Sequence, residues 1–326
     1  MNLNGMTVAV CGSTGFVGRH VVAALTGQGC RVRALVRDRE KARGALPEQG
    51  VEWVVGDGTD RGAVGELVAG SAAAVQCIGI RREFPPRTTF ARQHVMTARV
   101  LTEAMRSAGV GRLVHVSALG TRPDAATKYH RSKFEAETIV RNSGLEWTIL
   151  RPSLVHGADG EFMSMAKDWV LGRAAPWFVL PYFVRVEPPS GFPPAPKLVS
   201  AKVQPVHVDD VAQAVVASLR DARAVGEVYA LGGPEAFDWP TLLTTIRDTL
   251  PITEKWKKPA PLPGVLGAAV ATAAEAIGMG GALPFGPSEP IMATEDSVCA
   301  MDKAREHLGL RPRGFTSSLK QYAAQI

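Results

Sequence analysis

Tyr129 and Lys133 stand four residues apart in the run Tyr129-His130-Arg131-Ser132-Lys133. On a helix this spacing places both side chains on one face, so that the ammonium lies beside the phenol and favours its ionised form. An ordinary tyrosine pKa of about 10 is too high for easy proton exchange near neutrality, and a neighbouring cation lowers it. With Ser117 upstream, the pair indicates acid–base chemistry on a carbonyl or an alcohol. Alone, the same spacing is also that of an ordinary surface helix pair.

A glycine-rich segment near the N-terminus has the order of elements that a dinucleotide site requires. The apolar run 8–11 leads into the segment 12–18, and an amphipathic helical pattern follows. Glycines permit a tight turn and let the backbone approach a pyrophosphate, whose charge the helix N-terminus stabilises. The predicted contact residues are Gly12, Ser13, Thr14, Gly15, Phe16, Val17 and Gly18.

The end of the second expected strand bears on the choice of cofactor. An acidic residue at that position accepts the ribose hydroxyls of NAD. Here Val36 is followed by Arg37, which together with Lys41 is suited to a 2′-phosphate, so NADP (NADPH) is favoured while NAD stays possible. In the alternative, Arg37 is simply exposed and Asp38 takes the ribose. Asp57, after the third expected strand, is suited either to the adenine amino group or to capping the next helix.

Alternating strand and helix patterns position these residues. Six apolar runs, at 7–11, 32–36, 51–55, 73–78, 113–117 and 147–150, alternate with helical patterns at 16–27, 88–108 and 129–140. The alternation predicts an α/β fold with a doubly wound parallel sheet of the Rossmann type. We expect a dinucleotide-binding domain over residues 1–155 and a smaller C-terminal substrate lobe over residues 156–326, from which elements at about 203–232 return to the first domain.

The second half of the chain contains a stretch, 176–196, that is rich in proline and aromatic residues and cannot form a continuous helix. Its aromatic side chains are suited to line an apolar pocket or lid for a lipophilic, quinone-like substrate, and the alternative is a loop packed on the protein's own core. With the Ala/Gly-rich segment after Pro263, it could instead form a patch for a protein partner or a peripheral membrane contact. Helical patterns return at 209–219 and 239–250.

The composition is that of a globular enzyme or binding protein with a mild positive charge. The chain has 326 residues and a formal net charge of +6, with arginines scattered rather than clustered, so nucleic acid is not indicated. The four cysteines have no metal-ligand spacing, which predicts no metal site and a reducing, cytoplasmic setting. We expect no secretory signal, and the apolar segment 262–274 is too short to span a bilayer.

Taken in order, the motifs resemble the short-chain dehydrogenase/reductase superfamily in its extended or atypical branch. The matching motifs cover about two thirds of the chain and are Gly12-x-x-Gly15-x-x-Gly18, Asp57, His115-Val116-Ser117, Tyr129-x-x-x-Lys133, Arg151-Pro152-Ser153 and the run 205–210. Within that superfamily, the runs 116–120, 231–235 and 293–296 resemble the group named after an accessory subunit of respiratory complex I. That group also contains NAD(P)H-binding oxidoreductases.

The resemblance implies a role for each matching residue. Tyr129 would donate a proton to a carbonyl oxygen, Lys133 would hold the nicotinamide ribose, and Ser117 would hydrogen-bond the reacting oxygen. Gly79 would lie near the nicotinamide ribose, at a strand end whose sequence departs from the family pattern. The turn Pro152-Ser153 would approach the carboxamide.

A histidine also departs from the family pattern. His94 stands where these families commonly place an asparagine of the proton relay, so it is either a relay residue or a helix residue bonded in the interior. We expect His115 and His207 to be structural.

The leading prediction is an NAD(P)H-dependent oxidoreductase that reduces a carbonyl or quinone-like group of a lipophilic small molecule, with Tyr129 as the proton donor. The alternatives are a non-catalytic nucleotide-binding accessory or assembly protein, and a sugar-nucleotide epimerase or dehydratase. Against the epimerase stand Arg37 in place of an acidic strand end and a lobe that is apolar.

Overall fold

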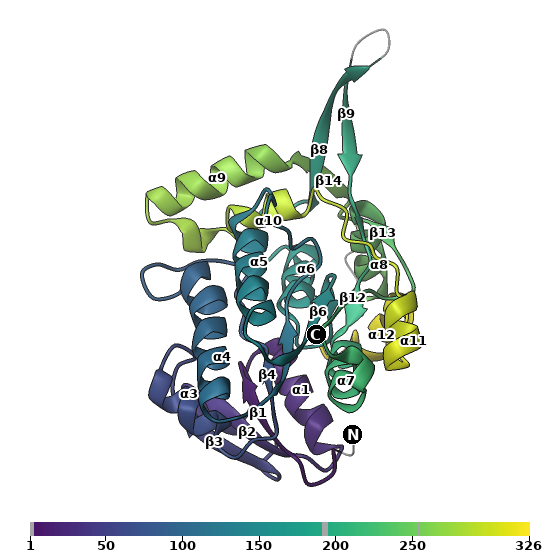
Figure 1. The fold of residues 1–326 in the computed structure, drawn as a ribbon. Coiled ribbons are helices and arrows are strands. Elements are labelled where there is room, and N and C mark those ends of the chain that lie inside the picture. The colour runs from purple at the N-terminus through teal and green to yellow at the C-terminus, as the bar shows by residue number, and fades with distance from the viewer. Residues whose placement is uncertain (1–2, 191–194, 253–254) are drawn as a thin grey trace. The chain divides into compact units, whose positions relative to one another are not determined.

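The computed structural model describes residues 3–190, 195–252 and 255–326, which form two compact units (Figure 1). The first unit comprises Met1–Pro152, Val208–Leu231 and Cys299–Pro312. The second comprises Ser153–His207, Gly232–Val298 and Arg313–Ile326. The chain therefore leaves the first unit and returns to it twice, and the second return, by residues 299–312, is not indicated by any sequence pattern above.

A parallel sheet forms the centre of the first unit and confirms the predicted doubly wound fold. Its strand order is β3-β2-β1-β4-β5-β6-β12, with every neighbouring pair parallel. The strands are β1 (Thr7–Cys11), β2 (Arg31–Val36), β3 (Val51–Val55), β4 (Ala73–Gln76), β5 (Arg112–Val116), β6 (Glu146–Pro152) and β12 (Glu227–Leu231). The last strand lies beside β6 and was not among the six predicted runs.

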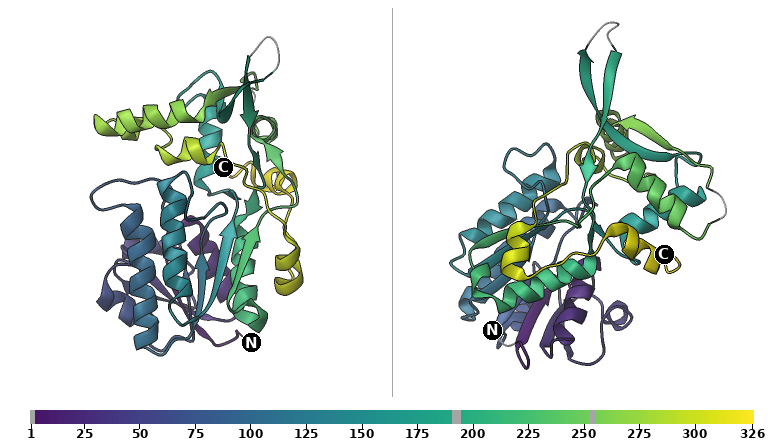
Figure 2. Two further views of the ribbon diagram at one scale, coloured as in Figure 1. Left: turned by 45° about the horizontal axis from the view of Figure 1, so that its top comes forward. Right: turned by 90° about the vertical axis from the view of Figure 1, so that its right-hand side faces the viewer.

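Helices cover both faces of this sheet (Figure 2). On one face α3 (Arg61–Val68), α4 (Thr97–Ser107) and α5 (Lys128–Arg141) pack side by side, and on the other α1 (Phe16–Thr26) packs against α7 (Val208–Arg220), which contacts α11 (Asp302–Leu308). Burial on both faces explains why the central strands read as unbroken apolar runs: Val8, Ala9 and Val10 are all fully buried. The remaining helices of this unit are α2 (Arg39–Arg43), a π-helical turn (Ala91–Met96) leading into α4, and a 3₁₀ turn (Ala222–Ala224).

The order of the strands reverses between β1 and β4. In doubly wound sheets, ligands bind outside the carboxyl ends of the strands at this switch point. The glycine loop 12–18 follows β1 directly, and the segment that contains Gly79 follows β4. The topology therefore brings two predicted cofactor segments to one edge of the sheet.

The second unit is a mixed assembly of helices and small sheets. Its helices are α6 (Glu161–Leu171), α8 (Trp239–Thr249), α9 (Gly264–Ala276), a 3₁₀ turn (Gly280–Ala282), α10 (Ser288–Met292) and α12 (Phe315–Tyr322). Its strand pairs are β7 (Val155–His156) with β11 (Val206–His207), and β10 (Lys202–Val203) with β13 (Phe237–Asp238). A three-stranded sheet contains β14 (Pro259–Pro263), β8 (Leu180–Ser190) and β9 (Ala195–Ser200). The core joins α6, α8 and α12 through Met163, Trp169, Leu242, Ile246, Phe315 and Leu319.

The proline-aromatic stretch forms most of an antiparallel hairpin made by β8 and β9, apart from residues 191–194, which lie outside the described residues. Strand β9 lies at an edge of its sheet, and the central strand β8 pairs with β14 only over Leu180–Val184. Beyond Val184, β8 therefore has one edge without a neighbouring strand, where prolines are tolerated. The aromatic side chains divide: Phe183 is buried against Phe285, whereas Trp177 and Phe178 are exposed. Over the part of the chain that the structure describes, no helix is long and apolar enough to cross a bilayer.

Candidate dinucleotide and active site

Two glycines of the loop after β1 are required by close packing. Gly12 has a φ of +78°, and a Cβ at this position would lie 2.7 Å from the backbone nitrogen of Ile78. A Cβ on Gly18 would overlap the carbonyl oxygen of Gly12. The loop therefore folds tightly against both the segment after β4 and its own helix, which is the geometry of a phosphate-binding turn.

The N-terminus of α1 is suited to an anion. Its N-cap, Gly15, is exposed and makes no side-chain capping bond, and the first turn contains no acidic residue. The backbone N–H groups and the positive end of the helix dipole therefore face a position where a pyrophosphate fits. Thr14, Phe16 and Val17 are half-buried around this turn. Ser13 differs, because its buried hydroxyl donates to Leu35 O at 2.8 Å and ties the loop to β2.

The residues after β2 that bear on the choice of cofactor are exposed or engaged by the next helix. Arg37 and Lys41 are both exposed. Asp38 is the N-cap of α2: its Oδ1 accepts from the backbone N–H groups of Glu40 at 2.9 Å and Lys41 at 3.3 Å. The carboxylate that could have taken the ribose is thus engaged by the helix that follows it.

Asp57 stabilises the turn after β3 by hydrogen bonds. Its Oδ1 accepts from the N–H of Thr59 at 3.0 Å and from its hydroxyl at 2.6 Å, and it pairs with Arg92 at 3.3 Å. Partial burial tends to raise the pKa of Asp57, but these bonds and the nearby Arg92 and Arg37 outweigh it and lower that pKa. The cap of α3 itself is Asp60. An adenine contact by the second oxygen of Asp57 stays a prediction.

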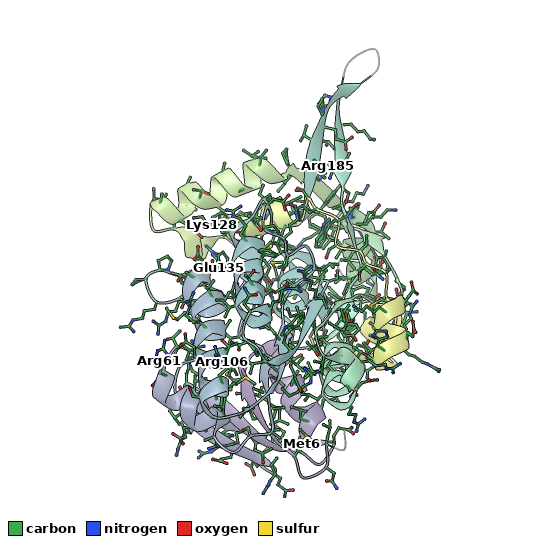
Figure 3. The ribbon with its side chains drawn as sticks, in the orientation of Figure 1. Met6, Arg61, Arg106, Lys128, Glu135 and Arg185 are labelled. Carbon is green, nitrogen blue, oxygen red and sulfur yellow. The ribbon has the colours of Figure 1, made fainter. Side chains whose placement is uncertain are left out.

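Helix α5 carries the tyrosine–lysine pair and divides its charges between two faces. Thr127 caps the helix by accepting from the N–H of His130. Lys128 and Glu135, both labelled in Figure 3, are exposed. Lys133 and Glu137 are buried on the opposite side. Together with Tyr129 they repeat every four residues, which places all three along one helix face.

Lys133 lies against the segment after β4. A Cβ on Gly79 would be 3.0 Å from its Nζ, so the glycine leaves room for the ammonium, which donates to Val116 O at 3.3 Å. Burial lowers the pKa of Lys133 to about 8, and this effect exceeds the rise in that pKa caused by the nearby Cys77 and Glu137. The structure thus brings Gly79 and Lys133 together at the switch point.

The contacts of Tyr129 are made by its ring. The ring packs edge-on against Phe90, His94 and His130, with centroids 5.9, 5.5 and 5.2 Å away. Burial raises the pKa of Tyr129 to about 12. Burial therefore moves the pKa of Tyr129 upward, opposite to the lowering that the sequence spacing suggests.

His94 lies between the segment after β4 and helix α5. Its Nδ1 is 2.8 Å from Ser132 Oγ, and its Nε2 is 3.1 Å from both the N and the O of Ile80. Ser132 Oγ in turn donates to Tyr129 O at 2.8 Å. A neutral ring with its proton on Nδ1 satisfies this chain, because Nε2 then accepts from Ile80 N–H.

The environment of His94 explains that neutral state. Burial and the nearby Lys133 hold its pKa well below the ordinary value. His94 belongs to a π-helical turn, a feature common at functional sites. His94 is thus an interior histidine whose ring contacts that of Tyr129, and a role in a proton relay stays a prediction.

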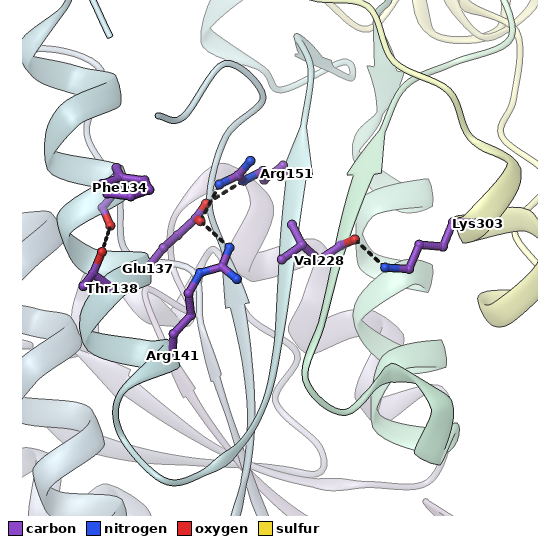
Figure 4. A network of polar contacts seen from close by, with 7 residues as sticks. All are labelled: Phe134, Glu137, Thr138, Arg141, Arg151, Val228 and Lys303. Atoms are coloured by element: carbon purple, nitrogen blue, oxygen red, sulfur yellow. Dashed lines mark hydrogen bonds and ion pairs between the residues drawn. The ribbon is translucent and has the colours of Figure 1, made fainter. Parts of the chain in front are cut away.

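Glu137 was not predicted, and it anchors the buried face of α5. Figure 4 shows its fully buried carboxylate held by Arg151 and Arg141. Burial alone would raise the pKa of Glu137, but hydrogen bonds from Arg151, Ser117 and Arg141 lower it. Its position four residues after Lys133, on the same helix face, could have indicated Glu137 from the sequence. Its contact with Arg151 of the Arg-Pro-Ser motif is seen only in the structure.

The remaining predicted residues lie at the ends of β5 and β6. Ser117 is buried near enough to Glu137 to help lower its pKa, although its Oγ makes no well-formed hydrogen bond within the described part of the chain. Pro152 ends β6, and its carbonyl accepts from Leu119 N–H at 2.8 Å. Ser153 begins the second unit, where its hydroxyl donates to Ser297 O at 2.7 Å. Their contacts with substrate and cofactor stay predictions.

The fold and the glycine loop define an NAD(P)H-binding protein. Residues 12–168 match the family model described as NAD(P)H-binding, which covers the loop, Gly79 and the Tyr129–Lys133 pair. The chain belongs to the extended, atypical short-chain dehydrogenase/reductase superfamily, and its relatives include proteins named as subunit 9 of complex I.

Curated relatives include both enzymes and subunits. The chain is 28% identical over 92% of its length to an Arabidopsis thaliana mitochondrial protein named NADH dehydrogenase [ubiquinone] 1 alpha subcomplex subunit 9, of which it covers 70%. It is 33% identical over 65% of its length to the ceramide reductase of Caulobacter vibrioides, covering 61% of that protein. It is 31% identical over 70% of its length to a Streptomyces griseus (4-alkanoyl-5-oxo-2,5-dihydrofuran-3-yl)methyl phosphate reductase, covering 68% of it. The chain thus spans about two thirds of the length of these relatives.

Solved structures share the fold over nearly the whole chain. The crystal structure of gox2253 is 25% identical, covers 97% of this chain and 96% of its own, and superposes with a TM-score of 0.70. A Thermus thermophilus UDP-glucose 4-epimerase in complex with NAD is 21% identical, and the match covers 98% of each chain with a TM-score of 0.68. The second likeness concerns the fold alone.

Proposed function

We propose that this protein is an NADPH-dependent reductase of a lipophilic carbonyl or quinone-like compound, and that Tyr129 supplies the proton. The observation that carries the proposal is the contact of Lys133 with Gly79 at the switch point, with Tyr129 one helical turn earlier on the same face of α5. A cofactor held by the glycine loop would bring its reactive end toward this pair.

The proposed chemistry assigns one task to each residue. When bound, the nicotinamide supplies a hydride to the carbonyl carbon. Tyr129 is protonated at neutral pH because burial raises its pKa to about 12, so it can donate its proton to the oxygen on which negative charge develops. The Lys133 ammonium then stabilises the phenolate that remains. His94 and Ser132 position the tyrosine through its ring and its backbone carbonyl.

The substrate class rests on two relatives. The Caulobacter vibrioides and Streptomyces griseus proteins are named as reductases, and both names describe substrates with an alkyl or acyl chain. We therefore propose a carbonyl compound with a similar lipophilic portion. The preference for NADPH rests on the exposed Arg37 and on the engagement of Asp38 by α2.

The variant Tyr129→Phe tests the proposal. It should reduce turnover of an aldehyde, ketone or quinone substrate by about 10²-fold or more, because a positioned general acid contributes that much. Affinity for NADPH, measured by calorimetry, should stay within about twofold. The matched control is Tyr229→Phe, which removes another buried phenol of the same unit, one that bonds His307 at 3.0 Å. Equal turnover by Tyr129→Phe and wild type would exclude the assigned role.

A second candidate is a nucleotide-binding accessory or assembly protein. It is favoured by the match to the Arabidopsis thaliana subunit 9 protein over 92% of the chain. Stable co-purification with a membrane-bound NADH-oxidising complex, together with no NADPH consumption against a panel of aldehydes, ketones and quinones, would support this candidate over the reductase.

A further inference from the structure

Large apolar side chains are exposed mainly on the second unit. Among the described residues, twelve of the sixteen such side chains belong to it. Four of them lie on or directly after one helix, α9: Val265, Leu266, Val270 and Ile277, which are 71%, 55%, 47% and 71% exposed. Contiguous exposed apolar surface of this kind is uncommon on proteins that have no partner for it.

Helix α9 buries its small residues and exposes its large apolar ones. Its small residues Gly264, Gly267 and Ala271 are buried, and a Cβ on Gly267 would lie 2.5 Å from the ring of Phe183 on β8. The small size of these residues lets the helix approach the sheet closely, and its larger apolar side chains are exposed on the other side. With 3.6 residues per turn, Val265, Leu266, Val270 and Ile277 fall on one continuous arc.

The charged residues that precede α9 from residue 255 onward are basic, whereas Glu275 near the end of the helix is exposed and acidic. From Lys255 to Ala274 the sequence contains three lysines and no aspartate or glutamate. Lys255 and Lys258 are exposed, and Trp256 between them is 57% exposed. They precede β14, whose five residues span about 17 Å and lead directly into α9. An uncharged apolar arc is thus preceded by a basic, tryptophan-containing segment.

We propose that α9, together with the basic segment 255–258, docks this protein on the surface of an anionic phospholipid bilayer. Tryptophan is enriched at membrane interfaces, and lysines near the surface are attracted to anionic headgroups. The thirteen residues of α9 extend for about 20 Å, so the helix lies in the interface and does not cross the bilayer. A protein partner would need polar groups to fix its orientation, and this arc offers only Thr272 among its exposed side chains before Glu275.

This surface belongs to the second unit and does not depend on the proposed reductase activity. If both are correct, docking brings the protein to the phase in which a lipophilic carbonyl compound dissolves. The two proposals fail separately, because turnover of a water-soluble carbonyl compound needs no bilayer.

The test is sedimentation of the full-length protein with vesicles. Binding is expected to vesicles of phosphatidylcholine that contain about a quarter phosphatidylglycerol, and it should weaken in high salt. The double variant Val265→Glu/Leu266→Glu should lower the partition coefficient about tenfold or more, because two carboxylates would enter the interface. Lys255→Glu/Lys258→Glu should lower it by a similar factor on anionic vesicles only.

The matched control is Val225→Glu, which changes a valine that is 38% exposed in the first unit and should bind vesicles within about twofold of wild type. Circular dichroism checks that each variant folds. Failure of the wild type to bind anionic vesicles would overturn the proposal, as would equal binding by Val265→Glu/Leu266→Glu. A concentration-dependent dimer that this double variant dissociates would show instead that a second copy of the chain covers α9.

Discussion

Glu137 and Arg151 form a bidentate ion pair that joins the middle of α5 to the C-terminal end of β6. Arg151 Nε donates to Oε1 at 2.8 Å and its Nη2 donates to Oε2 at 2.6 Å, while Arg141 adds a third bond at 3.1 Å. The carboxylate is fully buried. Because α5 also carries Tyr129 and Lys133, this pair fixes the helix that bears the proposed chemistry.

Removing the charge of Glu137 should destabilise the protein strongly. Glu137→Gln leaves two arginines without their anion, and breaking a buried pair costs about 3–5 kcal/mol in free energy of unfolding. Urea denaturation followed by circular dichroism measures this loss. Glu135→Gln, on the exposed face of the same helix, is the control and should cost less than about 0.5 kcal/mol. A loss below about 1 kcal/mol for Glu137→Gln would contradict the anchoring role.

The pH dependence of reduction should report Lys133. Burial lowers its pKa to about 8 in the free protein, so the ammonium is lost as the pH rises through that value. Since kcat/KM reflects the free enzyme, it should fall above about pH 8. Lys133→Arg keeps its charge and should remove this alkaline limb, although its overall rate will differ. A limb that is unchanged in Lys133→Arg would assign it to another group.

The cofactor preference should depend on Arg37. Arg37→Ala should weaken NADPH binding about tenfold or more, because a charge-assisted bond to the 2′-phosphate is lost, and should leave NADH binding within about twofold. Titration calorimetry with both nucleotides measures the two affinities. Arg39→Ala, an exposed arginine two residues further on, is the control. Equal affinities of the wild type for NADH and NADPH would refute the 2′-phosphate role.

Acid should destabilise the first unit through its buried histidines. The pKa values of His94 and His115 are lowered by burial and by Lys133, that of His115 to about 3. Below about pH 6.5 these histidines bind protons in the unfolded chain but not in the folded protein, so the free energy of unfolding falls as the pH falls. Each histidine adds a slope of about 1.4 kcal/mol per pH unit.

The variant His115→Leu separates the two contributions. Both ring nitrogens of His115 are buried without a hydrogen-bond partner in the described structure, so replacing the ring by an apolar side chain should cost little at pH 7. The slope between pH 6 and pH 5 should fall by about 1.4 kcal/mol per pH unit. Denaturation curves measured at each pH test this, and an unchanged slope would show that His115 takes up a proton in the folded state.

Local patterns were sufficient for most of the first unit. The predicted runs correspond to β1 to β6 because buried parallel strands need continuous apolar segments. Gly18 is required by a contact with Gly12 in the same loop, whereas the contact of Gly12 with Ile78 joins distant parts of the chain. The strand β12 was missed because it completes the sheet from residue 227, beyond the regular alternation. The returning segment 299–312 has no periodicity that distinguishes it from a surface helix.

The sequence alone determined the dinucleotide loop and the spacing of Tyr129 and Lys133, because each depends on residues that are close in the chain. The order of the motifs along the chain indicated the superfamily. The tertiary structure decided the electrostatics: burial raises the pKa of Tyr129 and lowers that of Lys133, and burial depends on elements that pack from distant parts of the sequence. It also decided the partners of Glu137 and the neutral state of His94. The pair of Glu137 with Arg151 and the bond of His94 with Ser132 join α5 to other elements, and no spacing along the chain encodes such contacts.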